Sequence, residues 1–163
     1  MPENSPFRPV DDDARALARQ LLTAADFAAL AVTRPDTGTP SVTRIALATD
    51  PQGAPLSLVS TLSSHTAALE AAPSCALLVG EPGPRGDPLT HPRLTLHAEA
   101  RLIARDAPEH PALRAHYLAQ RPKAQLYIDF GDFRMVSFRV TDALLNGGFG
   151  KAYRLAPEDL RPL

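Results

Sequence analysis

Residues 93–104 read "RLTLHAEARLIA", and apolar side chains alternate with polar ones over most of this stretch. Four aliphatic or small side chains fall on one side of an extended chain: Leu94, Leu96, Ala98 and Ala100. A period of two is typical of a strand that buries one face, because successive side chains point to opposite faces. The stretch therefore predicts a long, half-buried strand and indicates a fold built around a sheet.

Strand character recurs on both sides of this stretch, between turns rich in proline, glycine and aspartate. Five further strands are predicted, over residues 27–34, 41–50, 56–62, 75–80 and 133–145. Helices are predicted only at residues 14–25, 65–72 and 107–122, too few for a parallel sheet with helical crossovers. Residues 81–92, rich in proline and glycine, predict an exposed loop or flap. The chain thus reads as an α+β, mainly β protein with a six-stranded antiparallel barrel flanked by helices.

Composition bounds the class of protein. The 163 residues predict one domain, and 44% hydrophobic and 21% charged residues are ordinary globular values. A net charge of -1 gives no broad attraction for nucleic acid. We find no signal peptide and no apolar run of about 18 residues, so we expect no membrane contact and a cytoplasmic location. Three prolines among the first ten residues predict a flexible arm at 1–10, ahead of a single domain at 11–163.

Residues able to carry chemistry by themselves are few. Cys75 is the single cysteine, which excludes an internal disulfide, and its neighbours "SCALLV" predict a buried, inert thiol. The five histidines form no HxH or HExxH pair, so we predict no metal site. His97 and His116 would suit acid–base chemistry because imidazole titrates near neutral pH, and a structural role is the other interpretation of each. No catalytic residue is predicted.

The stretch "STLSSHTAALEAAP" at 60–73 gathers hydroxyls and an imidazole where a strand gives way to a helix. A helix that begins near Ser63 or Ser64 has unpaired N–H groups and a partial positive end, so these side chains would complete a phosphate cradle. The other interpretation is one serine N-cap with solvated neighbours. Arg44, on a strand among small residues, would hold an anion or a carboxylate, or would be an exposed charge at the rim.

Two further segments suit a flat ligand. The aromatic cluster "YIDFGDF" at 127–133 would pack beneath one end of the barrel or stack on a bound ring. "GGFG" at 147–150 is too short for a dinucleotide fingerprint, and its glycines would form a turn or let the backbone approach a ligand.

Several motifs, taken in order over residues 12–155, resemble the pyridoxamine 5′-phosphate oxidase-like flavoproteins, in particular their haem-utilisation (HugZ-like) branch. The similar segments are "RLTLHAEARL", "HYLAQRPKAQLYIDFGDF" and "GGFGKA". An earlier motif is met by a spaced set of residues: Pro40, Asp50, Gly53, Pro55, Leu56, Leu58, Ser60, Leu62, Ser63, His65 and Thr66. The chain departs from the branch in having Ala68 and Ala98 where asparagine and glycine are usual. It also ends at Leu163, without the additional C-terminal domain that supplies a haem ligand, so we expect no haem breakdown.

The resemblance implies a Greek-key split barrel that binds FMN at the interface of a homodimer. It places five side chains around the FMN phosphate and ribityl chain: Ser60, Ser63, Ser64, His65 and Thr66. The strand around Arg44, Ile45 and Leu47 would pass along the flavin ring through backbone contacts. Arg93 would make another ring or ribityl contact. The segment "GGFGKA" would come close to the ring, from the same or the second subunit, with Lys151 as a charge partner.

Two functions follow from the sequence. The first is an FMN-dependent oxidoreductase acting on a small-molecule redox substrate, in which the cofactor carries the difficult step and the protein positions it. The alternative is a non-catalytic protein that binds or carries FMN or haem.

Overall fold

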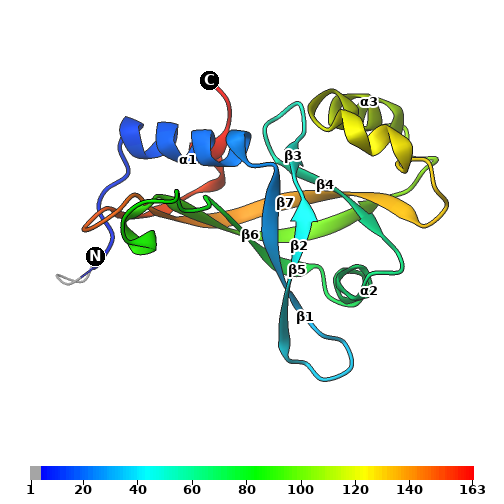
Figure 1. Ribbon diagram of the computed structural model, residues 1–163, viewed down its shortest axis with the longest axis horizontal. Coiled ribbons are helices and arrows are strands. Elements are labelled where there is room, and N and C mark those ends of the chain that lie inside the picture. Colours follow the sequence, from blue (N-terminus) through cyan, green and yellow to red (C-terminus); the bar gives the residue numbers. More distant parts are fainter. Residues whose placement is uncertain (1–4) are drawn as a thin grey trace.

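Eight strands form one antiparallel sheet in the computed structural model, which describes residues 5–163. The order across the sheet is β2-β1-β5-β6-β7-β4-β3, and β8 pairs with β7. Their bounds are β1 (Phe27–Thr33), β2 (Pro40–Ala46), β3 (Ala48–Thr49), β4 (Pro55–Ser60), β5 (Ser74–Val79), β6 (Arg93–Ile103), β7 (Phe133–Asn146) and β8 (Ala152–Leu155). The sheet curls into a half-barrel (Figure 1). Ser57 Oγ on β4 donates to the carbonyl of Ala46 on β2 at 2.5 Å, which links the two sides of the curl.

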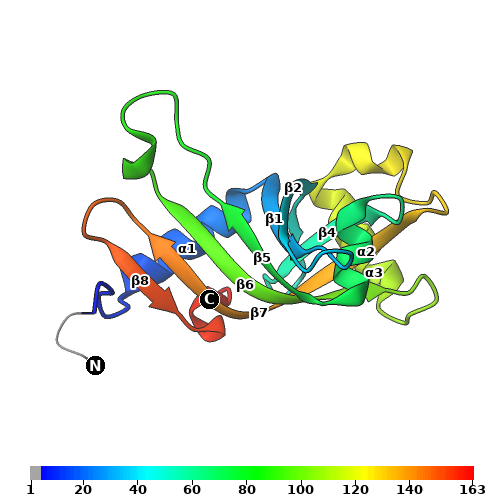
Figure 2. The same cartoon turned by 90° about the horizontal axis from the view of Figure 1, so that it is seen from below.

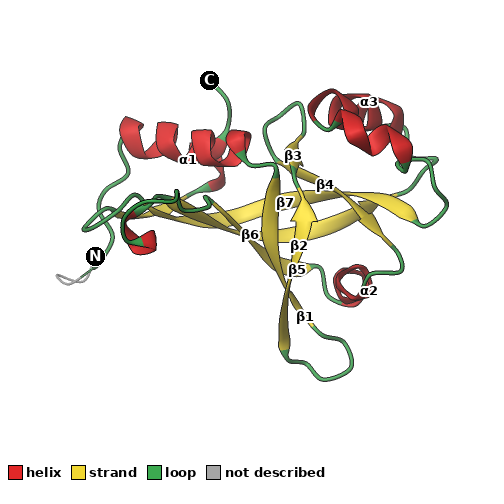
Figure 3. Cartoon of the chain, viewed as in Figure 1, coloured by secondary structure: helices red, strands yellow, loops and turns green. Residues whose placement is uncertain are grey.

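This arrangement confirms the predicted mainly β, antiparallel split barrel with flanking helices (Figure 3). The strand count differs from the predicted six for two reasons. The strand expected at 41–50 divides into β2 and β3 at Leu47, whose side chain is fully buried. The glycine-rich segment near the C-terminus leads into β8, where Tyr153 pairs with Leu145 of β7.

Three α-helices flank the sheet: α1 (Asp12–Ala24), α2 (Ser64–Ala71) and α3 (His110–Gln120). The Asp11 carboxylate accepts the Ala14 N–H at 2.8 Å and caps α1, as the acidic start of this segment predicted. Helices α1 and α3 lie on the same side of the sheet toward opposite ends, whereas α2 lies beside β1 and β2 (Figure 1). The short 3₁₀ helices are η1 (Pro88–Thr90), η2 (Pro122–Leu126) and η3 (Pro157–Leu160).

The helices cover two apolar clusters. The larger cluster joins α1 and α2 to the buried faces of the central strands, through residues such as Leu30, Leu77 and Leu96. The smaller one lies under α3 and includes the fully buried Tyr117 with Met135 of β7. Burial of each large aliphatic side chain contributes about 1.5–3 kcal/mol, so these clusters supply the main stabilisation of the sheet.

Between residues 5 and 163, no α-helix packs on the other side of strands β2, β1, β5, β6 and β7, and Pro88 and Leu89 of the 81–92 loop border this side at Ala29 and Leu78. Its residues alternate with the buried ones, and we call them the open face: Ala29, Ala31, Val42, Arg44, Ala76, Leu78, Thr95, His97, Asp142 and Leu144. Val42 is 66% exposed and Leu78 is 45% exposed. The open face is thus rich in small and apolar side chains, and two of them, Ala29 and Leu78, line a cavity under the 81–92 loop.

The 81–92 loop and residues 5–10 of the N-terminal arm lie at the same end of the sheet (Figure 2). In the 81–92 loop, the Gly83 N–H donates to Nδ1 of His91 at 3.2 Å, and Nε2 of the same ring lies 2.8 Å from the Arg85 carbonyl. Residues 1–4 of the predicted arm lie outside the described residues. Farther along the arm, the Arg8 N–H donates to the Ala152 carbonyl at 2.8 Å, so this part of the arm lies along β8.

Candidate functional site

The corner between β4 and α2 is held by two of the predicted site residues. Ser60 Oγ donates to Oδ2 of Asp132 at 2.7 Å and accepts the Leu62 N–H at 3.1 Å. The buried Thr66 hydroxyl donates to the Ser60 carbonyl at 2.5 Å. These bonds are internal to the protein, so Ser60 and Thr66 shape the corner in this structure.

The N-terminus of α2 has unused hydrogen-bond donors. Ser63 occupies the N-cap position, and its side chain makes no capping bond. Among the described residues, the N–H groups of Ser64 and His65 find no acceptor, and the Ser64 side chain is exposed. A helix start with free N–H groups and adjacent hydroxyls has the donor chemistry that a phosphate requires.

His65 links this corner to the edge strand β2. Its Nδ1 lies 3.0 Å from the Thr43 hydroxyl, and the imidazole is half-buried. Burial lowers the pKa of His65, because the charged ring is less well solvated there. A neutral ring therefore predominates at neutral pH, and an anion placed nearby would favour its protonation.

A cavity of about 240 Å³ lies between the β1–β2 hairpin and α2, beside the free end of the helix. Ser64 lines this cavity together with Ser41 and Arg34. The Arg34 guanidinium donates to Asp36 at 2.8 Å, and this hydrogen bond lowers the pKa of the Asp36 carboxyl. Sequence reasoning missed Arg34 because it lies at the end of β1, far along the chain from the 60–73 stretch.

Arg44 lies across β2 from this corner. It follows Thr43, which contacts α2, so its side chain points to the open face, where the guanidinium lies 4.9 Å from the centre of the Phe27 ring. The backbone of Leu47, which directly follows β2, is engaged in hydrogen bonds. The Leu47 N–H donates to the Asp26 carbonyl at 2.9 Å, and its own carbonyl accepts from Nε of Arg121 at 2.7 Å.

Bonded and non-bonded pairs alternate along an antiparallel ladder, so Ile45, like Leu47, bonds to β1 through its backbone. The side chains of Ile45 and Leu47 are buried in the core. Of the three residues predicted to line the flavin ring, only Arg44 presents its backbone groups to the free edge of β2. The two other contacts stay predictions.

The remaining predicted site residues lie elsewhere in the monomer. Arg93 begins β6, and its guanidinium donates to the Leu89 carbonyl at 3.1 Å beside a cavity of about 210 Å³ under the 81–92 loop. Lys151 is exposed in the turn between β7 and β8. The structure therefore gathers the residues from Ser60 to Thr66 into one corner but does not bring Arg93 or Lys151 to it within one chain.

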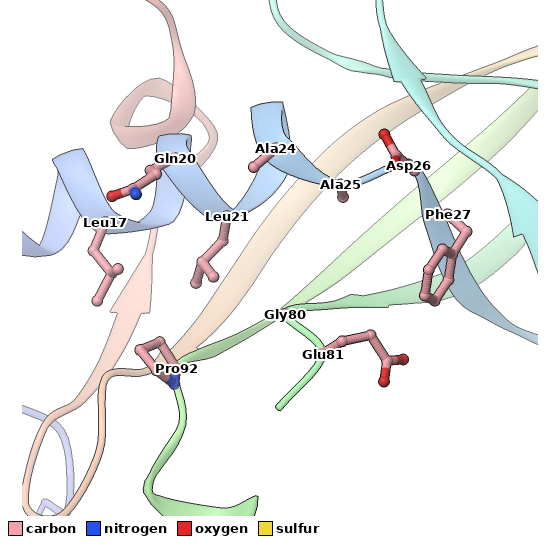
Figure 4. Close-up of a pocket in the computed structure, with 10 residues that line it drawn as sticks. All are labelled: Leu17, Gln20, Leu21, Ala24, Ala25, Asp26, Phe27, Gly80, Glu81 and Pro92. Carbon is pink, nitrogen blue, oxygen red and sulfur yellow. The ribbon is translucent and has the colours of Figure 1, made fainter. Parts of the chain in front are cut away.

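A larger cavity of about 390 Å³ lies between α1 and the adjoining ends of β5 and β6 (Figure 4). Leu17 and Leu21 of α1 line it, and the carboxylates of Asp26 and Glu81 lie at its border (Figure 4). None of the predicted site residues lines this cavity, so its size alone does not make it the functional site.

Other candidate groups have structural surroundings. Burial raises the pKa of the Cys75 thiol to about 11, which agrees with the predicted inert thiol. In the aromatic cluster, the rings of Tyr127 and Phe133 pack with centroids 4.9 Å apart.

None of the helices described between residues 5 and 163 has the length and apolar character that a bilayer-spanning helix requires.

Comparison with known proteins places these features in a family. The family described as pyridoxamine 5′-phosphate oxidase matches residues 14–146. The chloroplastic heme oxygenase HOZ of Arabidopsis thaliana is 38% identical over 134 residues, which cover 75% of this chain and 40% of HOZ. The chain therefore spans well under half of this plant relative.

Two solved structures are similar over nearly the whole chain. The protein Atu2129 of Agrobacterium tumefaciens, described as of unknown function, is 32% identical with a TM-score of 0.82, over 98% of this chain and 66% of that one. A heme binding protein from Mycobacterium smegmatis is 27% identical with a TM-score of 0.81, over 94% of this chain and 61% of that one. The names of the Mycobacterium smegmatis protein and of HOZ agree with the resemblance to the haem-utilisation branch. The chain belongs to the pyridoxamine 5′-phosphate oxidase family.

Proposed function

We propose that the chain is an FMN-binding oxidoreductase that holds the cofactor phosphate at the N-terminus of α2. The observation that carries this proposal is the pair of unused N–H groups at Ser64 and His65, beside the uncapped Ser63 side chain. These donors fit a phosphate dianion, because anions are stabilised by the positive end of a helix. Membership of the pyridoxamine 5′-phosphate oxidase family adds support to this proposal.

The rest of the cofactor would extend past the free edge of β2. Arg44 presents backbone groups at this edge, and its side chain reaches the open face on the far side of the strand. An elongated ligand held at α2 would thus meet β2 next. When bound, FMN supplies a ring that accepts and returns electrons, whereas the residues described here bind it, orient it and limit its contact with water.

We also propose that the functional form is a homodimer that pairs through the open face. Val42 and Leu78 expose apolar surface there, and a second copy would cover it. Arg93 and Lys151, which lie away from the α2 corner in one chain, would approach it from the partner. A flat cofactor between two such faces would also be shielded from water on both sides.

Titration of FMN fluorescence against the purified full chain tests the phosphate site. We expect the double variant Ser63→Ala/His65→Ala to bind FMN at least about tenfold more weakly, from the loss of donors to a charged group. Riboflavin lacks the phosphate, so its affinity should change little. The matched control is Ser74→Ala/His116→Ala, which changes the same residue types away from the N-terminus of α2. A double variant that still prefers FMN over riboflavin as strongly as the wild type contradicts the phosphate assignment.

A redox cycle separates the oxidoreductase from a carrier. The FMN-loaded protein should lose its visible flavin absorbance when NADH or NADPH is added without oxygen, and it should regain that absorbance when air is admitted. Bound flavin that is never reduced by either nucleotide supports a carrier of FMN instead.

Haem binding is the second candidate function, because two of the similar proteins are named for haem. Addition of ferric haem to the purified chain should produce a protein-bound Soret band if this function is present. Free haem in the same buffer is the reference spectrum.

A further inference from the structure

Strand β7 has a gap in its pairing on the side away from β6. Residues 133–137 of β7 pair with β4, and residues 143–146 pair with β8. Among the described residues, no strand pairs with residues 138–142 on this side. A cavity of about 640 Å³ opens at the gap, and Arg139 and Val140 of β7 line it. It exceeds the cavities described above in volume and has the size of a small-molecule site.

Segments far apart in the sequence enclose this cavity. The C-terminal segment that contains η3 lies beside α1 (Figure 1), and the buried side chains of Leu22 and Leu160 contribute apolar walls from these two helices. The β3–β4 turn meets the C-terminal segment, because ring carbons of Pro162 lie 2.8 Å from the position that a Cβ would take at Gly53. The Asp50 carboxylate holds this turn by accepting two of its N–H groups at 2.9 Å. The walls are therefore mainly apolar and are fixed by the fold.

Two kinds of polar group lie in this apolar lining. Successive residues of a strand direct their N–H and C=O groups to alternate sides, so either Arg139 or Val140 presents its backbone groups to the gap. The second kind is cationic: Arg139 and Arg161 line the cavity, and no carboxylate between residues 5 and 163 lines it with them. The lining therefore favours an anionic ligand over a cationic one.

The two arginines differ in the partners that they have. Arg139 donates to Glu99 across the β6–β7 pairing. The Arg161 guanidinium takes part in none of the side-chain hydrogen bonds or ion pairs of the described residues. Of the acidic residues just before it, Asp159 is engaged by a guanidinium of α1 at 2.8 Å, and Glu158 lies outside the lining. Arg161 thus brings an uncompensated positive charge to the border of an apolar cavity.

We propose that this cavity is a second small-molecule site, and that its ligand is a small carboxylate with an apolar body. The apolar body covers Leu22 and Leu160, which removes apolar surface of both molecules from water. The carboxylate pairs with Arg161, whose planar guanidinium matches two carboxylate oxygens. None of the residues assigned above to the flavin or to the open face lines the cavity. The site is therefore independent of both candidate functions.

Amide NMR of the isotope-labelled full chain, titrated with octanoate, tests where the ligand binds. The amide signals of Gly53, Val140 and Leu160 should shift and reach saturation, whereas those of Ser64 and His65 at the α2 corner should stay in place. The probe 1-octanol has the same apolar chain length without the carboxylate. It should bind at least about threefold more weakly than octanoate, because it lacks the charge that pairs with a guanidinium.

Substitution of Arg161 tests the charge. Arg161→Gln keeps a side chain that donates hydrogen bonds and removes the positive charge, so octanoate should bind about threefold to tenfold more weakly. Its affinity for 1-octanol should stay at the wild-type value. Arg85→Gln, at an exposed arginine of the 81–92 loop, is the matched control and should bind octanoate as the wild type does.

Two controls separate loss of the site from damage to the protein. Thermal unfolding of each variant reports the fold, and titration of Arg161→Gln with FMN reads the flavin site, which should keep its wild-type affinity. The proposal is overturned if millimolar octanoate shifts none of the amide signals around the cavity. It is also overturned if octanoate binds Arg161→Gln as tightly as it binds the wild type.

Discussion

Arg121 and Leu47 are joined by a hydrogen bond of 2.7 Å from guanidinium Nε to the backbone carbonyl, although 74 residues separate them in the chain. The same guanidinium donates to the Ala25 carbonyl at 2.8 Å and lies 3.2 Å from the Asp26 carboxylate. One side chain thus holds together the end of α3, the start of β1 and the point where β2 gives way to β3.

Arg121→Ala should lower the free energy of unfolding by about 1.5–3 kcal/mol, because two partly buried carbonyls lose a charged donor. Arg121→Lys should lose less stability than Arg121→Ala, because lysine keeps a charged donor. It should not match the wild type, because lysine cannot form the planar fork that reaches both carbonyls. Urea denaturation measures the change. Arg101→Ala, at an exposed ion pair with Glu109, is the control and should cost less than about 1 kcal/mol. Equal losses in the two alanine variants would contradict the bracing role.

Tyr117 is fully buried, and its hydroxyl finds no hydrogen-bond partner among the described residues. The same burial raises its pKa to about 12. Tyr117→Phe removes an unsatisfied polar group without opening a cavity, so thermal unfolding should show unchanged or increased stability. Tyr117→Ala should cost about 3–5 kcal/mol through the cavity that it leaves. A clear loss of stability in the phenylalanine variant would mean that the hydroxyl has a partner in solution.

Asp159 connects η3 to α1. Burial acts to raise the pKa of Asp159, but hydrogen bonds from Arg15 and from the Ala156 N–H outweigh it, so the pKa is lowered overall. A carboxyl with a lowered folded-state pKa contributes stability above its ordinary pKa of about 3.9, and this contribution is lost as the pH falls through the folded value.

Asp159→Asn should therefore reduce stability at pH 7 by about 1 kcal/mol and flatten the decline that the wild type shows below about pH 4. Denaturation midpoints measured between pH 3 and 7 check both effects. Parallel pH curves for the variant and the wild type would exclude Asp159 as a source of acid sensitivity.

Thr43 orients His65 beside the proposed phosphate site. Thr43→Val preserves the shape of the side chain and removes the hydroxyl, so FMN affinity should fall about threefold to tenfold, the value of one hydrogen bond. Thr43→Ser keeps the hydroxyl and should bind FMN nearly as the wild type does. Fluorescence titration measures both affinities, and equal affinities for the valine and serine variants would show that His65 needs no support from β2.

Leu78 lies near the middle of the proposed dimer interface and is 45% exposed in the single chain. Leu78→Asp would bury a charge between two copies, so size-exclusion chromatography should show a shift from about twice the chain mass to the monomer. Leu126→Asp is the control, because Leu126 is 78% exposed in η2, away from the open face. A Leu78→Asp protein that elutes as the wild type contradicts pairing through this face.

Periodicity was sufficient to predict the elements with strong local patterns. The acidic start of α1 and the alternation of β6 depend only on neighbours in the sequence, and both appear in the structure. The short β8 could not be predicted in this way, because its four residues form a strand through pairing with β7. Leu62 shows the opposite error: it continued the apolar pattern of β4, but the strand ends at Ser60 and Leu62 is 85% exposed.

The candidate site was predictable as a segment but not in its details. The density of hydroxyls at 60–73 marked the corner, yet composition does not distinguish a hydroxyl that holds the fold from one that faces a ligand. Ser60 is engaged by Asp132, which lies 72 residues away, and His65 is engaged by Thr43, which lies 22 residues away. Such pairings depend on strand order, which local patterns do not contain.

Strand order also bears on how the chain is made. In the β1–β2 hairpin the paired strands are neighbours in the sequence. In contrast, β4 pairs with β7, which comes much later in the chain, and Leu56 is opposite Ser137. During synthesis, β4 therefore leaves the ribosome with only the two-residue strand β3 to pair with, until most of the chain has been translated. Its apolar residues are then open to chaperones or to other nascent chains, and a slow stretch of translation before residue 133 would prolong that exposure.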